Sequence, residues 1–120
     1  MQISPYVYPG ILDASKYETI SDKTIIFERA TDAVCSTLGL TIEDLVSRRR
    51  YRHLVVARAM LSNILRSKYM YTLSSIGVLL GGRDHSTILH CIDIHNNLIY
   101  TNAENYRVLY SKALNKLHKW

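Results

Sequence analysis

The sequence has little of the chemistry that marks several classes of protein. It holds two cysteines, Cys35 and Cys91, which are far apart and form no CxxC pair. This pattern predicts reduced, buried thiols in a cytosolic protein rather than a disulfide framework. No apolar run approaches the ~20 residues of a membrane-spanning helix. The first ten residues lack a basic stretch followed by an apolar one, so we expect no secretory signal.

A nucleotide-binding loop is also missing. The pattern Gly-x-x-x-x-Gly-Lys-Ser/Thr does not occur, and residues 81–87 lack the lysine that such a loop requires. The 120 residues correspond to about one domain, and a hydrophobic content of 48% is ordinary for a globular protein. We therefore expect one small domain with a single core, no cofactor and no ATPase module.

Acidic residues are absent from the middle third of the chain. Residues 45–83 contain eight lysines and arginines but no aspartate or glutamate, whereas residues 1–44 carry a net charge of −4. The overall charge of +5 therefore understates a basic block that attracts polyanions. Nucleic acid is the commonest polyanionic partner. An anionic membrane surface and a merely solvated face are the alternatives.

The spacing of apolar residues predicts a mostly helical chain without strands. Two prolines near the start predict an irregular arm over residues 1–20, followed by a helical domain over residues 21–120. Cap-type residues mark several helix ends: Ser21-Asp22, Gly39, Thr41, Thr72 and a capping box formed by Thr101 and Glu104.

Two of the expected helices are joined by a Gly81-Gly82 turn, which is typical of a helix-turn-helix. The motif covers about residues 73–100, with residues 73–80 as the supporting helix and residues 84–100 as the recognition helix. If the isoleucines of the recognition helix face inward, steps of about 100° point four short polar side chains outward. These are Ser86, His90, Asp93 and Asn97.

The helical geometry of this segment argues against two other functions. Asp84, His85 and Ser86 are the residue types of a hydrolase triad, but neighbours on a helix point about 100° apart and cannot align for catalysis. Steps of five residues separate His85, His90 and His95, and each step rotates by about 140°, so the three do not share a metal-binding face. We predict no catalytic or metal site, and a buried His95.

The segment from Gly81 to His90 resembles the signature of a known family, the C-terminal DNA-binding domain of the bacterial replication initiator DnaA. The order and spacing of upstream elements agree over about residues 25–100, namely Ile42-Glu43-Asp44-Leu45, Ala57-Arg58 and Ser75-Ile76-Gly77. The resemblance implies an all-α helical bundle that contains a helix-turn-helix, similar to the Trp repressor.

The resemblance also implies roles for individual residues. Arg50 corresponds to an arginine that enters the minor groove, and Arg58 and Arg66 correspond to residues that contact the DNA backbone. Asp84 and His85 correspond to contacts with base edges. The expected DNA contacts are Arg48, Arg49, Arg50, Arg52, Arg58, Arg66, Arg83, Asp84, His85, Ser86, Thr87 and His90.

The sequence departs from the family pattern in three respects, which involve four positions. Ala59 stands where a glutamine usually follows the backbone-contacting arginine, and Ser74 stands where a proline is common. Asp93 and Ile94 occupy places where basic residues usually follow the last histidine of the signature. We therefore expect fewer phosphate contacts and an altered target sequence.

Together these features predict sequence-preferring binding of double-stranded DNA, in replication initiation or its regulation, by a domain that stands alone. A phage, a plasmid or another mobile element is the kind of source that such a domain suggests, and the bacterial cytoplasm, at the nucleoid, is the expected location. Two alternatives stay open: a transcriptional regulator that represses a promoter, and a module that docks on replication proteins. Both a monomer and a homodimer fit the sequence.

Overall fold

The computed structural model describes residues 15–118, with side chains from Ile25 onward. Over that range the chain forms helices and connecting turns only, which confirms the all-α fold class. The elements are α1 (Ser15–Leu38), α2 (Ile42–Val46), α3 (Arg52–Tyr69), α4 (Leu73–Leu79), α5 (His85–Thr101), the 3₁₀ helix η1 (Ala103–Asn105) and α6 (Tyr106–His118).

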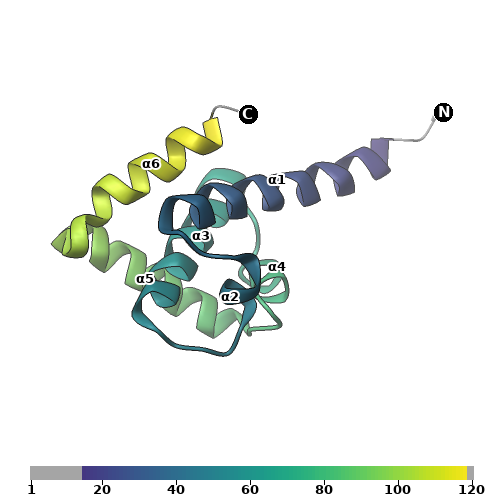
Figure 1. Ribbon diagram of the computed structural model, residues 1–120. Coiled ribbons are helices and arrows are strands. Elements are labelled where there is room, and N and C mark those ends of the chain that lie inside the picture. Colours follow the sequence, from purple (N-terminus) through teal and green to yellow (C-terminus); the bar gives the residue numbers. More distant parts are fainter. Residues whose placement is uncertain (1–14, 119–120) are drawn as a thin grey trace.

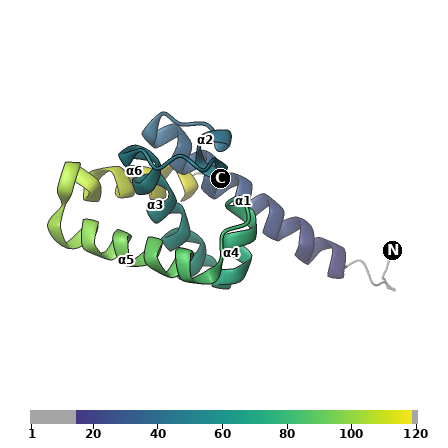
Figure 2. The ribbon, with the colours of Figure 1, turned by 90° about the horizontal axis from the view of Figure 1, so that it is seen from below.

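Helix α3 is the centre of the bundle. Ten of its 18 residues are buried, among them Ala57, Leu61 and Ile64. Helix α5 packs along one side of α3 and α1 packs along another, while α6 packs against α1 (Figure 1). The N-terminal half of α1 projects beyond the other helices (Figure 2). Within the described range, no helix has the length and apolarity needed to cross a bilayer.

Several local expectations are confirmed. The Thr41 side chain caps α2 in a capping box with Asp44, and the Thr72 side chain accepts from a backbone amide at the start of α4. Gly39 follows α1 with a left-handed φ of 72°. Cys35 and Cys91 are buried free thiols. Burial, with a smaller contribution from nearby acids, raises the pKa of Cys35 to about 11.

The start of α1 differs from the expectation. The helix begins at Ser15 rather than at the Ser21-Asp22 pair. Serine and aspartate cost at most about 0.7 kcal/mol inside a helix, and no proline or glycine occurs between residues 15 and 38. Cap-type residues therefore do not have to begin a helix here. Residues 15–20 of the expected arm are helical, and residues 1–14 lie outside the described range.

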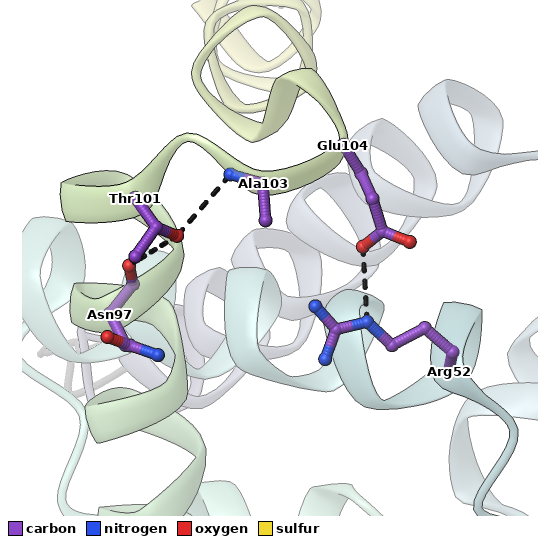
Figure 3. A network of polar contacts seen from close by, with 5 residues as sticks. All are labelled: Arg52, Asn97, Thr101, Ala103 and Glu104. Atoms are coloured by element: carbon purple, nitrogen blue, oxygen red, sulfur yellow. Dashed lines mark hydrogen bonds and ion pairs between the residues drawn. The ribbon is translucent and has the colours of Figure 1, made fainter.

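The corner between α5 and α6 also differs, because the predicted capping box of Thr101 and Glu104 does not form. Asn102 ends α5 with φ 53°, and its side chain accepts from the Arg107 amide at 3.0 Å. The Glu104 carboxylate instead lies 3.1 Å from Nε of Arg52 (Figure 3). A contact between residues distant in sequence thus replaces the local one.

A buried polar cluster joins α5 to α6. Nδ1 of His95 lies 2.6 Å from the Tyr106 hydroxyl oxygen, and His95 is 5% exposed, which confirms it as a core residue. Tyr110 stacks on Tyr106 and accepts from the Asn63 amide at 2.9 Å. Burial lowers the pKa of His95 from 6.5 to about 4.

This burial predicts a loss of stability in acid. In the unfolded chain His95 binds a proton near pH 6.5, whereas in the folded domain it stays neutral down to about pH 4. The unfolded state therefore binds more protons in this window, and the free energy of unfolding should fall as the pH falls through it. Thermal unfolding at several pH values should show this drop. The drop in stability should be smaller in His95→Gln and unchanged in a His53→Gln control. An unaltered drop in His95→Gln would contradict its attribution to His95.

Candidate nucleic-acid interface

The helix-turn-helix consists of α4, residues 80–84 and α5. The carbonyl oxygen of Gly77 accepts from the backbone amides of Gly82 and Arg83, at 3.0 and 2.8 Å. A Cβ atom on Gly77 would lie 1.9 Å from the carbonyl oxygen of Arg83. Gly81 has a left-handed φ of +87°, which a residue with a side chain rarely adopts. The close turn therefore depends on glycines in both the supporting helix and the turn.

The recognition helix α5 begins with a cap followed by exposed polar residues. Oδ1 of Asp84 accepts from the Thr87 amide at 2.9 Å, and this hydrogen bond lowers the pKa of the carboxyl group. His85, Ser86 and Thr87 follow, and all three are exposed. Asp84 thus orders the helix N-terminus while remaining ionised at the surface.

The predicted outward face of α5 is confirmed. Ile88 is fully buried, and Ile92 and Ile99 are half-buried, so these side chains face the bundle. The four polar residues expected to point outward are all exposed, namely Ser86, His90, Asp93 and Asn97. The segment therefore presents short hydrogen-bonding groups to solvent along its length.

A buried arginine holds the loop between α2 and α3. Arg58, which is 5% exposed, donates from Nε to the Leu45 carbonyl at 2.8 Å and from Nη1 to the Arg49 carbonyl at 2.7 Å. Its Nη2 donates to the carbonyls of Asp44 and Ser47, at 3.2 and 2.8 Å. One guanidinium thus donates both to carbonyls at the C-terminal end of α2 and to the loop that follows. We call residues 47–51 the basic loop.

Two further arginines connect the basic loop to the turn of the helix-turn-helix. Arg83 donates from Nη2 to the Ser47 carbonyl at 2.6 Å and from Nη1 to the Leu80 carbonyl. Arg48 donates to the Gly81 carbonyl at 3.4 Å. Burial first, and then repulsion from neighbouring arginines, lowers the pKa of both Arg58 and Arg83. The fold therefore holds several positive charges close together.

A cleft of about 730 Å³ opens between the basic loop and the recognition helix. Four arginines line it, and Asp84 is the one acid among its lining residues. In the described part of the chain no ion pair neutralises these arginines. The expected DNA contacts that the structure brings together here are Arg48, Arg50, Arg58, Arg83, Asp84, Ser86, Thr87 and His90.

The remaining expected contacts lie around or away from this cleft. Arg49 is exposed on the basic loop, and His85 is exposed at the tip of α5. Arg52 points to the corner between α5 and α6, where it pairs with Glu104 (Figure 3). Arg66 lies at the end of α3 and donates to the Tyr71 carbonyl at 3.0 Å, next to the start of α4. The structure thus does not place Arg52 or Arg66 in the cleft.

Sequence reasoning did not assign three apolar residues to this cleft. Val55, Cys91 and Ile94 line it together with the arginines. Cys91 and Ile94 follow Thr87 by four and seven residues, and this spacing places all three on one side of a helix. The same spacing rule that predicts the outward face of α5 could therefore have found Cys91 and Ile94, but not Val55, which comes from α3. They give the cleft an apolar wall beneath its charged rim.

Proteins of one family resemble this chain. The family model described as the bacterial dnaA protein helix-turn-helix matches residues 27–94. The chromosomal replication initiator protein DnaA of Chlorobaculum tepidum is 29% identical over 97 residues, which cover 80% of this chain and 19% of that protein. The DnaA of Streptococcus uberis is 30% identical over 104 residues, which cover 87% of this chain and 23% of that protein. The chain spans about a fifth of the length of these relatives. No solved structure gives a significant match.

Proposed function

The chain belongs to the family of bacterial DnaA helix-turn-helix domains, and from that premise we propose that it binds double-stranded DNA with a preference for particular sequences, in replication initiation or its regulation. The cleft is the observation that carries this proposal. Four arginines, which form no ion pair within the described residues, lie beside a helix that exposes short polar side chains in its first turn and beyond. Positive charge supplies affinity for phosphates, and short polar side chains suit base edges.

In the proposed complex, α5 lies in the major groove with its N-terminal side chains toward the bases. The sugar-phosphate strand that borders this groove occupies the cleft, next to Arg48 and Arg83. Arg50, which also lines the cleft, then reaches the adjacent minor groove, where an arginine senses groove width and A·T content. Phosphate contacts of this kind set the register of the protein on the duplex.

Base recognition rests on the first turn of α5. Asp84 uses Oδ1 for the helix cap, so Oδ2 accepts from the exocyclic amine of cytosine or adenine. His85 donates to a purine acceptor or packs on a thymine methyl group. The hydroxyl groups of Ser86 and Thr87 bind bases or phosphates, and the free amides of the helix N-terminus favour a phosphate at the same end.

The other arginines act less directly. Arg58 positions the basic loop, because its guanidinium donates to four backbone carbonyls. Arg66 lies beside α4, and the first helix of such a motif crosses the DNA backbone, so Arg66 contacts phosphates outside the cleft. We expect the smallest contribution from Arg52, which is paired with Glu104.

This DNA-binding activity requires no ATP hydrolysis by these residues, since the sequence contains no nucleotide-binding loop. A location at the nucleoid follows from the same proposal. The alternative functions are repression of a promoter and docking on replication proteins. Selection of bound duplexes from a random pool would supply the target, and the symmetry of that target would show whether one or two copies bind.

His85→Ala tests the proposed recognition directly. The affinity for the selected duplex should fall by about 1–3 kcal/mol, while the affinity for a random duplex should not change. Fluorescence anisotropy with both duplexes measures this difference. Asn97→Ala, also exposed on α5 but about three turns further along the helix, is the control and should alter neither affinity. Equal weakening on both duplexes by His85→Ala would rule out a base-reading role.

A further inference from the structure

The recognition helix carries an apolar side chain beside its polar first turn. Leu89 is 50% exposed, and it follows His85 and Ser86 by four and three residues. Tyr100, the other large apolar side chain of α5 that is exposed, lies about three turns further along the helix. Single exposed apolar residues are common on protein surfaces. The position of Leu89, rather than its exposure alone, is therefore the informative feature.

Helix geometry places Leu89 next to the expected base-reading residues. Side chains on an α-helix lean toward its N-terminus, and residues three and four apart share one face. The isobutyl group of Leu89 therefore covers the turn that holds His85 and Ser86. Leu89 does not line the arginine cleft, whereas Thr87 and His90 do. It lies on the part of the exposed surface of α5 that faces away from the basic loop.

The charge of α5 favours base edges over phosphates as the neighbours of Leu89. The helix contains no lysine or arginine along its 17 residues. Asp93, four residues after Leu89, is exposed and negatively charged, so it would repel a phosphate near this surface. A contact that needs no charge, between an apolar side chain and the floor of the groove, fits this position.

We propose that Leu89 selects thymine by packing against its C5-methyl group in the major groove. This inference rests on the proposed function. Thymine is the base that presents a methyl group there, and a leucine side chain cannot form hydrogen bonds, so it distinguishes thymine by that group alone. Removing one apolar carbon from a buried contact lowers affinity about fourfold.

Replacement of thymine by uracil in the duplex isolates this contact, because uracil pairs in the same way and lacks only the methyl group. Each thymine of the selected duplex is replaced in turn, and binding is measured by anisotropy for the unaltered protein, Leu89→Ala and Val108→Ala. Val108 is 53% exposed on α6, so its truncation is a control matched in exposure. Thermal unfolding confirms that all three proteins are folded.

The unaltered protein and Val108→Ala should lose about fourfold in affinity at one or two thymine positions. Leu89→Ala should bind the thymine and uracil forms of those positions equally. Two results would overturn the inference while leaving the proposed function intact: uracil tolerated at every position by the unaltered protein, or the same thymine preference in Leu89→Ala. Absence of binding to any duplex would instead overturn the proposed function, and the inference with it.

Discussion

Arg58→Ala should weaken binding to selected and random duplexes alike and also destabilise the domain. The substitution leaves the Leu45 and Arg49 carbonyls without a donor, and a buried group left unsatisfied costs about 1–3 kcal/mol. Solvent can reach part of the basic loop and satisfy some of these carbonyls, which reduces the cost. We therefore expect a loss of about 3 kcal/mol in the free energy of unfolding. The released loop no longer holds Arg48 and Arg50 at the cleft. Chemical denaturation and anisotropy measure the two effects.

Arg58→Lys separates this positioning role from a direct phosphate contact. Lysine keeps the positive charge, but its single ammonium group cannot donate to four carbonyls in the planar arrangement of a guanidinium. If Arg58 acts through the loop, Arg58→Lys should remain both destabilised and weak in DNA binding. Full recovery of binding by lysine would show that charge alone is what matters.

Arg107→Ala is the matched control for these variants. Arg107 also donates to carbonyls at a helix end, those of Ile99 and Tyr100, at 2.8 and 3.1 Å. It is exposed and lies on α6, away from the cleft. Its removal should cost about 1 kcal/mol or less and leave DNA binding unaltered. A loss of binding in Arg107→Ala would mean that any destabilisation, rather than loss of the loop, weakens the complex.

Gly77→Ala should also destabilise the domain strongly, although alanine favours helices by about 1 kcal/mol over glycine. The new Cβ atom would lie 1.9 Å from the Arg83 carbonyl oxygen, and neither atom can rotate away, because the backbone fixes the positions of both. The turn would have to move, and its hydrogen bonds to the Gly77 carbonyl would break. We expect a loss of about 3 kcal/mol and a melting temperature lower by roughly 10 °C.

Gly39→Ala provides the comparison for Gly77→Ala. Gly39 has a left-handed φ of +72°, and no atom lies within 4 Å of the position of its Cβ. Its substitution therefore adds backbone strain of about 1–2 kcal/mol without a collision. In thermal unfolding, the melting temperature of Gly77→Ala should be well below that of Gly39→Ala. The opposite order would contradict the close packing of the turn against α4.

The sequence predicts local structure well where short-range chemistry determines it. The spacing of Ile88, Ile92 and Ile99 orients α5, and Thr41 and Thr72 cap the helices that follow them. Each of these features depends on residues within one or two helical turns. The same reasoning failed at Glu104, because its partner Arg52 comes from a helix that precedes it by 52 residues.

The role of Arg58 shows why the site could be predicted only in part. Its basic character is evident in the sequence and fits a phosphate contact. Its hydrogen bonds depend on how the end of α2 and the basic loop pack beside α3, and no local pattern encodes that packing. The cleft likewise joins Arg48 to His90, which only the tertiary structure brings together. Residue types thus predicted a DNA interface, and the fold shows which of the predicted residues line one cleft.

Titration of the unaltered domain with duplex DNA at two salt concentrations tests whether the arginine cleft and the recognition helix form a DNA-binding surface. Anisotropy titrations should give tighter binding to the selected duplex than to a random duplex at both concentrations. Each neutralised phosphate contributes about −0.9 to the slope of log affinity against log salt, so the three arginines proposed to contact phosphates, Arg48, Arg66 and Arg83, predict a slope of roughly −3. No binding to either duplex at low salt, or an affinity independent of salt, would contradict the account.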